Sequence, residues 1–183
     1  MVGDKIAGLF ETTNYLSRRK QMKKIVVLLF GIFLASVIWA DGSDDRDLLN
    51  FGSMVGVSGP FVGPVTPIQG VGGAGRNWTV SRARGELKSN GEIEVHVRGL
   101  VFADGTGAGT NPLKTFRAVL SCQSIDAAGK PTIILSSTGD FPASPEGDAE
   151  IEGTVEVASP CFAPIVFVTT STPIPRWLAV TGH

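Results

Sequence analysis

The chain has 183 residues, which is enough for one domain and a separate leading segment. Charge divides unevenly: residues 1–40 carry six Lys/Arg against two Asp/Glu, a net charge of +4, and residues 41–183 carry 10 against 15, a net charge of −5. Nucleic-acid binding depends on neutralising phosphates with Lys and Arg, so the acidic part is a poor candidate and we expect no nucleic-acid partner.

An uncharged apolar run follows a basic cluster near the N-terminus. The cluster lies in residues 18–24, and the run is residues 25–40, IVVLLFGIFLASVIWA. A membrane-spanning helix needs about 20 apolar residues, so this shorter run suits the helical core of an export signal. Ala40 is small, as signal peptidase requires, and polar residues begin at Asp41. We predict a signal peptide over residues 1–40.

Other interpretations of this segment stay open. Ile38 fits the small-x-small cleavage pattern poorly, and an uncleaved run would act as a membrane anchor with its basic side in the cytoplasm. Residues 17–23, SRRKQMK, resemble a twin-arginine signal with Gln in place of the expected Phe. A true start at Met22 would remove residues 1–21. In each case we expect the remaining chain to be secreted or extracytoplasmic, with membrane contact only through residues 25–40.

Two cysteines, Cys122 and Cys161, lie in the part expected to be exported. An even number in an oxidising compartment predicts one disulfide, and closing its loop of about 40 residues would stabilise the fold by about 4 kcal/mol. The sequence has no C-x-x-C, and its only histidines after residue 40 are His96 and His183. We therefore expect no metal site and no cofactor.

Residues 41–75 are predicted to be extended. Residues 41–47, DGSDDRD, contain four carboxylates but lack the Gly and distal Glu of an EF-hand loop, so a solvated terminus is expected. Residues 52–75 are rich in Gly and Pro, which disfavour helices and central strands. Apolar residues such as Phe61 and Val65 indicate that this segment lies on the domain.

From residue 76 onward the sequence alternates as β-strands do. In residues 91–99, GEIEVHVRG, apolar and charged side chains alternate strictly, and residues 149–157 repeat the pattern. In residues 115–122, Cys122 shares its face with apolar residues and should point into the core. Further strands are expected at 78–82, 85–88, 131–136, 165–168 and 176–182.

Turn residues separate these strands, and no window after Ala40 has helical periodicity. About eight short strands with one disulfide predict an all-β fold, specifically an immunoglobulin-like β-sandwich over residues 76–183. Four stretches resemble a group of uncharacterised exported bacterial proteins: VRGLV (97–101), NPLKTFRAVLSC (111–122), GDAEIEGTVEV (147–157) and SPCFAPIVFV (159–168). The resemblance implies a secreted single-domain β protein and no particular activity.

Four residues are possible ligand contacts. Residues 104–111, DGTGAGTN, contain G-x-G-x-G, but a phosphate-binding loop needs a helix directly after the glycines. We expect an inter-strand loop, with Asp104 and Asn111 as possible contacts. Trp78 and Trp177 would form a stacking platform for sugars if exposed, and core if buried; burial is expected because indoles contribute a large apolar area.

His96 and the outward carboxylates are the candidates for catalysis. Hydrolysis could use His96 as a base, or the pairs Glu92/Glu94 and Glu150/Glu152. A solvated sheet face with cross-strand ion pairs explains the same pattern. We predict no catalytic residues and an exported, non-enzymatic binding or structural domain for an extracellular ligand or cell-surface partner. The alternative is a secreted hydrolase that uses these side chains.

Overall fold

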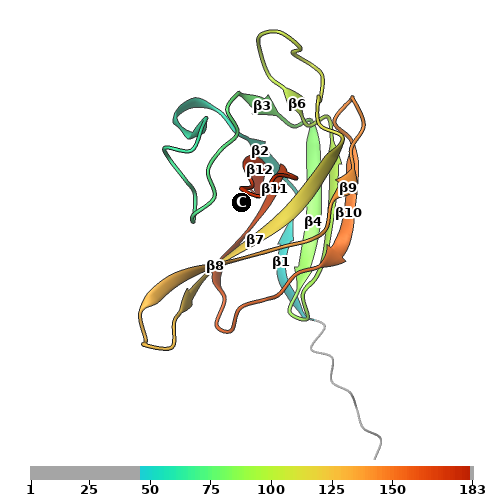
Figure 1. Ribbon diagram of the computed structural model, residues 1–183. Coiled ribbons are helices and arrows are strands. Elements are labelled where there is room, and N and C mark those ends of the chain that lie inside the picture. Colours follow the sequence, from blue (N-terminus) through green and yellow to red (C-terminus); the bar gives the residue numbers. More distant parts are fainter. Residues whose placement is uncertain (1–45, 182–183) are drawn as a thin grey trace, which may run out of the picture. The chain divides into compact units, whose positions relative to one another are not determined.

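The computed structural model describes residues 46–181, which form an all-β unit (Figure 1). The predicted fold class is therefore confirmed at this level, and the predictions for residues 1–45 lie outside the described residues. The described residues contain no α-helix; their one helical element is the short 3₁₀ turn η1 (Gly59–Phe61). No helix within residues 46–181 is long and apolar enough to cross a bilayer.

Two antiparallel sheets contain most of the strands (Figure 1). The smaller sheet has the order β1 (Asp47–Phe51), β4 (Arg82–Lys88), β5 (Glu92–Arg98), β10 (Ala149–Thr154). The larger sheet has the order β2 (Met54–Gly56), β12 (Trp177–Thr181), β11 (Phe162–Thr170), β7 (Thr115–Ile125), β8 (Pro131–Ser137), and β9 (Phe141–Pro142) also pairs with β7. A separate pair joins β3 (Trp78–Thr79) and β6 (Val101–Phe102).

The structure revises the predicted division of the strands. Residues 78–82 and 85–88 were expected as two strands, but the chain forms the two-residue β3 and then a continuous β4. Gly85 stands in the middle of β4, where an added Cβ would lie only 2.7 Å from the Phe51 ring of β1. The glycine therefore makes room for the neighbouring strand and does not interrupt β4. Residues 41–75, expected to be merely extended, contribute β1 and β2 as edge strands.

The inward faces of the two sheets form one hydrophobic cluster. Alternation in β5 buries Ile93, Val95 and Val97, as predicted. The predicted inward residues of β7 are also buried: Phe116, Ala118, Leu120 and Cys122. Because each fully buried aliphatic or Phe side chain contributes roughly 1.5–3 kcal/mol, these two faces contribute substantially to the stability of the fold.

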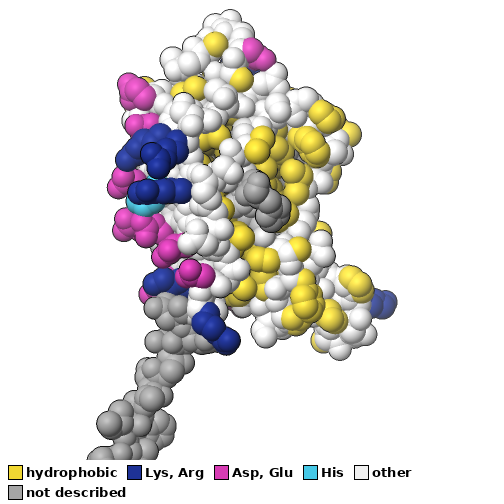
Figure 2. Space-filling view, turned by 180° about the vertical axis from the view of Figure 1, so that it is seen from behind, with side chains coloured by type: hydrophobic (Ala, Val, Ile, Leu, Met, Phe, Trp, Pro, Cys, Tyr) yellow, Lys and Arg dark blue, Asp and Glu magenta, His cyan; other side chains and the backbone are white. Residues whose placement is uncertain are grey.

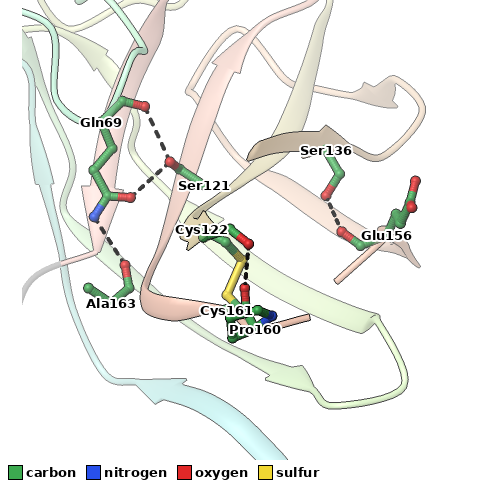
Figure 3. The surroundings of a disulfide bond; sticks show 9 residues. Gln69, Ser121, Cys122, Ser136, Glu156, Pro160, Cys161 and Ala163 are labelled. Atoms are coloured by element: carbon green, nitrogen blue, oxygen red, sulfur yellow. Dashed lines mark hydrogen bonds between the residues drawn. A yellow bond between two sulfur atoms is a disulfide. The ribbon is translucent and has the colours of Figure 1, made fainter. Parts of the chain in front are cut away.

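β7 is covered on its second face as well, where Val119 and Ser121 are buried. The covering chain comes from the Gly/Pro-rich segment, whose Val71 belongs to the core cluster. The Ser121 hydroxyl donates to the Gln69 side-chain oxygen at 2.9 Å, and the Gln69 amide donates to the Ala163 carbonyl at 3.1 Å (Figure 3). The segment is thereby attached to both β7 and β11.

The predicted disulfide is confirmed. Cys122 of β7 is bonded to Cys161, which precedes β11, with Cα atoms 4.9 Å apart (Figure 3). Nearby, the Ser124 hydroxyl donates to the Pro160 carbonyl at 2.8 Å. The turn before β11 is therefore held to β7 by one covalent bond and one hydrogen bond.

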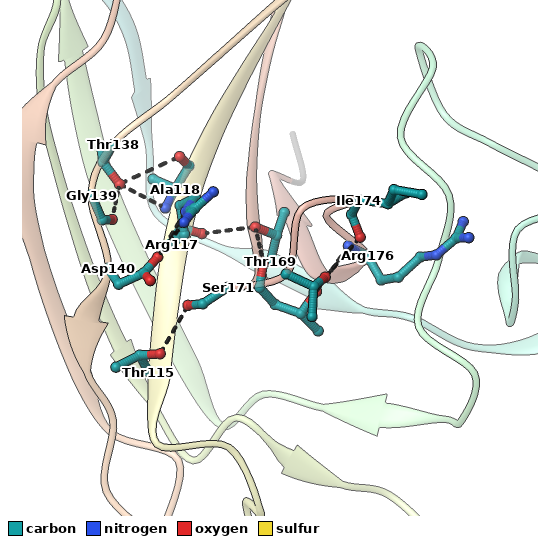
Figure 4. A network of polar contacts seen from close by, with 12 residues as sticks. Thr115, Arg117, Ala118, Thr138, Gly139, Asp140, Thr169, Ser171, Ile174 and Arg176 are labelled. Atoms are coloured by element: carbon teal, nitrogen blue, oxygen red, sulfur yellow. Dashed lines mark hydrogen bonds and ion pairs between the residues drawn. The ribbon is translucent and has the colours of Figure 1, made fainter.

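A polar network holds the chain where it leaves β8 (Figure 4). The buried Thr138 hydroxyl accepts from the Ala118 amide at 3.1 Å and donates to the Gly139 carbonyl at 2.8 Å. One residue earlier in β7, Arg117 forms an ion pair with Asp140 at 2.7 Å. The Ala118 amide of β7 thus donates to the Thr138 hydroxyl, in place of the main-chain carbonyl that a regular β-ladder would supply.

Candidate functional site: the charged face of the smaller sheet

The outward face of β4, β5 and β10 carries a dense group of charged side chains. Alternation along each strand sends the apolar residues inward and the charged ones outward. The outward residues are Arg82, Arg84, Glu86 and Lys88 on β4, Glu92, Glu94, His96 and Arg98 on β5, and Glu150 and Glu152 on β10. Figure 2 shows Lys/Arg, Asp/Glu and a histidine gathered along one side of the molecule.

The strand register places like charges directly opposite one another, in one row of arginines and one row of carboxylates across the sheet. Arg82 lies directly opposite Arg98. One carboxylate row crosses three strands, with Glu86 opposite Glu94 and Glu94 opposite Glu152. Like charges placed opposite each other destabilise a sheet, so neither row is explained by the stability of the sheet.

The arginine row borders a shallow hollow of about 190 Å³, lined by Arg82, Arg84, His96, Arg98 and Glu150. Arg98 forms an ion pair with Glu150 at 2.8 Å. His96 contacts the Glu94 carboxylate through Nε2, and its Nδ1 lies 3.9 Å from Glu150.

The two remaining guanidinium groups of the hollow have no partner. Both Arg82 and Arg84 are exposed, and neither side chain forms a hydrogen bond or ion pair in the described part of the chain. Each keeps five N–H donors available in a planar fork that matches carboxylate or phosphate oxygens. The hollow therefore combines unused donors with an excess of positive charge, on a domain that is acidic in total.

The carboxylate row does not form a metal centre. Among the described residues, no group of three or more His, Cys, Asp or Glu side chains is arranged to hold a metal ion. The row borders two further hollows of about 230 and 190 Å³ that lie on the same sheet face. Glycoside hydrolysis requires two carboxylates on opposite sides of a bound sugar, whereas these side chains stand next to one another on one face.

Both tryptophans lie in the core, as expected, so Trp78 and Trp177 are not the ligand contacts that the alternative of a stacking platform would have required. Trp78 and Trp177 are only 4% and 2% exposed. The Trp78 ring meets Phe102 edge-on at 4.7 Å, and Trp177 lies 6.3 Å from Phe61. The large apolar area of an indole favours burial, and a buried ring offers no face to a sugar.

Asn111 is also structural. It is buried, and its side-chain amide donates to the carbonyls of Leu113 and Ser144 at 2.8 and 2.9 Å. Its side-chain oxygen accepts from the Leu113 amide at 2.9 Å, so no polar atom of this side chain is left for a ligand. Its role is to hold two loops together.

Asp104 is exposed but is held within its own loop. Its carboxylate accepts from Asn77 at 2.5 Å, and its carbonyl accepts from Arg76 at 2.7 Å. The Arg76 guanidinium lies over the Phe102 ring, 4.0 Å from the ring centre. Residues 104–111 lead towards β7 without a helix, as expected for an inter-strand loop.

Arg82 and Arg84 were not predicted from the sequence as candidate site residues. Their signal was the Arg-Ala-Arg alternation, which is visible only when residues 82–88 are taken as a single strand. His96 does lie on the outward face, as predicted, with its side chain 25% exposed. No family model, curated protein or solved structure matches the chain.

Proposed function

We propose that this chain is an exported, non-enzymatic binding domain that takes an anionic ligand in the hollow formed by Arg82, Arg84 and Arg98. The observation that carries the proposal is that the Arg82 and Arg84 guanidinium groups have no partner within residues 46–181, although Arg98 lies directly opposite Arg82. An oxyanion bridging these groups would relieve their repulsion and accept charge-assisted hydrogen bonds, which are about twice as strong as neutral ones.

The chemistry of the site limits what the ligand can be. Guanidinium groups bind carboxylate and phosphate oxygens, and exposed ion pairs contribute only about 0.2–1 kcal/mol each. A single anionic group would therefore bind weakly at so open a site. We infer a ligand with repeated carboxylate or phosphate groups, as in an acidic polymer outside the cell.

A binding role has more support than hydrolysis. No Ser, Thr or Cys lines the three hollows of this face, so His96 has no neighbouring hydroxyl or thiol to activate. The carboxylates stand on an open sheet and not on two walls of a cleft. Binding an anion, in contrast, requires only hydrogen-bond donors with positive charge, and the arginines of the hollow supply these.

An extracytoplasmic location is part of the proposal. The disulfide between Cys122 and Cys161 fits an oxidising compartment, and the composition of residues 1–40 suits an export signal. We also infer that the two sheets form an immunoglobulin-like sandwich, which is supported by the single hydrophobic cluster between their inward faces.

Export is tested on protein from its native host by mass spectrometry. A mature N-terminus at Asp41 is expected. A membrane-bound species that retains residues 25–40 would show the uncleaved anchor instead. Replacing Arg18 and Arg19 by Lys should leave export unchanged on the Sec route and block it on the twin-arginine route.

Ligand binding is tested by titrating residues 41–183 with polyphosphate and, separately, with polyglutamate. We expect at least one polymer to bind, more weakly as salt rises, because exposed charges are screened. The double variant Arg82→Ala/Arg84→Ala should weaken binding about tenfold or more, as the loss of two charge-assisted contacts implies. Comparing the polymers separates phosphate from carboxylate recognition.

The control removes the same charge elsewhere. Lys114→Ala/Lys130→Ala lowers the net charge equally but leaves the hollow intact. An equal loss of binding in both double variants would show attraction to overall charge rather than a site. Absence of binding to both polymers at low salt would contradict the proposal.

A further inference from the structure

The outer edge of the larger sheet is formed by β8, which among residues 46–181 pairs with β7 alone. Its sequence, PTIILSS, contains no charge. Ile133, Ile134 and Leu135 are 45%, 39% and 44% exposed, although consecutive residues point to opposite faces. Figure 1 shows the β7–β8 hairpin extending away from the rest of the domain, and Figure 2 shows hydrophobic atoms on this projection.

The other sheet edges are protected. β10 carries Glu150 and Glu152, β1 begins with Asp47, and β2 has only three residues. Charges and shortness are the usual protections against pairing with another strand. β8 has seven residues and exposed aliphatic side chains, and it carries no charge; Pro131 protects only its first position, which leaves Thr132 to Ser137 open. An edge of this kind is a template for a further strand.

The free hydrogen-bonding groups of β8 can be assigned from its register. The Thr138 amide donates to the Ala118 carbonyl, and the β7–β8 pairing continues without a shift from Ser137 to Pro131. Main-chain groups alternate in direction along an antiparallel strand. The N–H and C=O groups of Ile133 and Leu135 therefore point away from β7, towards the open edge.

We propose that β8 pairs antiparallel with β8 of a second copy of the chain, about a two-fold axis beside Ile134. In this register Ile134 lies opposite its own equivalent, and Ile133 lies opposite Leu135 of the second copy. Thr132 lies opposite Ser136 of the second copy. Apolar side chains thus meet apolar ones, the Ser136 hydroxyl keeps its hydrogen bond to the Glu156 carbonyl within its own chain, and the outward groups of Ile133 and Leu135 complete the ladder without burying a charge.

The disulfide makes this edge suitable for pairing. Cys122 lies directly opposite Ile134 in the β7–β8 register and is bonded to Cys161. The middle of β8 therefore pairs with a part of β7 that the disulfide already restrains. The β8 strand then loses less conformational freedom on association than an unrestrained strand would. Ile125 and Phe162, 48% and 54% exposed, extend the apolar surface of the same region.

The contact between the two strands is small. A pair of seven-residue strands buries less than the roughly 1,200 Å² at which stable interfaces begin. The dimer should therefore form and dissociate with concentration instead of being permanent. Since β8 belongs to the larger sheet, this inference does not depend on the anion-binding proposal.

Sedimentation of residues 41–183, with the disulfide intact, tests the inference between about 5 and 500 µM, since association follows mass action. A monomer–dimer equilibrium is expected. Ile134→Lys should weaken association at least tenfold, because two ammonium groups would face each other at the axis. Ile134→Val should retain it. The matched control Ile174→Lys changes a 69% exposed loop residue and should have no effect.

Amide hydrogen exchange on the unmodified protein tests the register even if the Lys variant fails to fold. The amides of Ile133 and Leu135 should become protected only at high concentration, whereas the Ile134 amide, bonded to β7, should be protected throughout. A protein that stays monomeric over the whole range would overturn the inference. Protection of Ile133 and Leu135 that is independent of concentration would do the same, since the edge would then be covered within one chain.

Discussion

Reduction of the Cys122–Cys161 disulfide should destabilise the domain by about 4 kcal/mol. The bond joins residues separated by 39 positions and so closes a loop of about 40 residues in the unfolded chain. On the chain-entropy model, releasing such a loop increases the entropy of the unfolded state by about 13 cal/mol/K, which is about 4 kcal/mol at 25 °C. Small domains have total stabilities of about 5–15 kcal/mol, so the reduced protein should stay folded in water with a reduced margin.

Urea unfolding of residues 41–183, followed by tryptophan fluorescence, measures this effect. Trp78 and Trp177 are both buried and will report the loss of the core. With a urea dependence of about 1–3 kcal/mol per M, the midpoint should fall by roughly 1–4 M on reduction. The variant Cys122→Ala/Cys161→Ala should unfold near the reduced protein and should not respond to reductant.

A difference below about 1 kcal/mol between oxidised and reduced protein would refute this reasoning, because the loop entropy would then not determine the stabilisation. The same conclusion would follow if the double variant were as stable as the oxidised protein. Equal stability would mean that the unfolded chain already keeps the ends of this loop together, or that the folded bond is opposed by a comparable cost.

Three further stability predictions follow from buried or constrained positions, each measured by the same urea titration. Asn111→Asp should cost about 1–3 kcal/mol or more, since a carboxylate cannot donate to the two carbonyls that the amide now serves; an unchanged midpoint would contradict the structural role of this side chain. Thr138→Val should cost about 1–3 kcal/mol by leaving the Ala118 amide buried without its acceptor, whereas Thr138→Ser should retain most of the stability; equal losses in the two variants would point to packing instead of the hydroxyl. Gly147→Ala should be much more destabilising than Gly129→Ala, because both glycines have positive φ but only the first would place a methyl group against neighbouring main chain; the second should cost only the roughly 1–2 kcal/mol of the left-handed conformation.

The local pattern of side chains predicted much of the fold because strand alternation is a property of neighbouring residues. Ile93, Val95 and Val97 could be assigned to the core from their spacing alone, and they are buried. Cys122 could be assigned to the same face as its apolar neighbours, and with only one possible partner its disulfide followed. These inferences needed no knowledge of which strands pair.

The residues of the candidate site, in contrast, are brought together by the pairing of the strands. Arg82 and Arg98 are separated by a turn, and only the β4–β5 register places them opposite each other. Glu150 reaches the hollow because β10 pairs with β5 from a distant part of the chain. A single sequence contains no direct signal for such register, because it results from the packing of the inward faces and from the turns between strands.

The sequence by itself determined which residues can form strands, which faces those strands bury, and that the two cysteines have only each other to pair with. Tertiary structure decided the order of the strands, and with it what is exposed. The three consecutive apolar residues of β8 are typical of a strand buried on both faces. They are exposed because β8 ends its sheet, whereas Val166, Phe167 and Val168 of β11 are buried in the middle of the same sheet, between β7 and β12. Burial of a side chain depends on the neighbours that the fold supplies, and local alternation does not specify those neighbours.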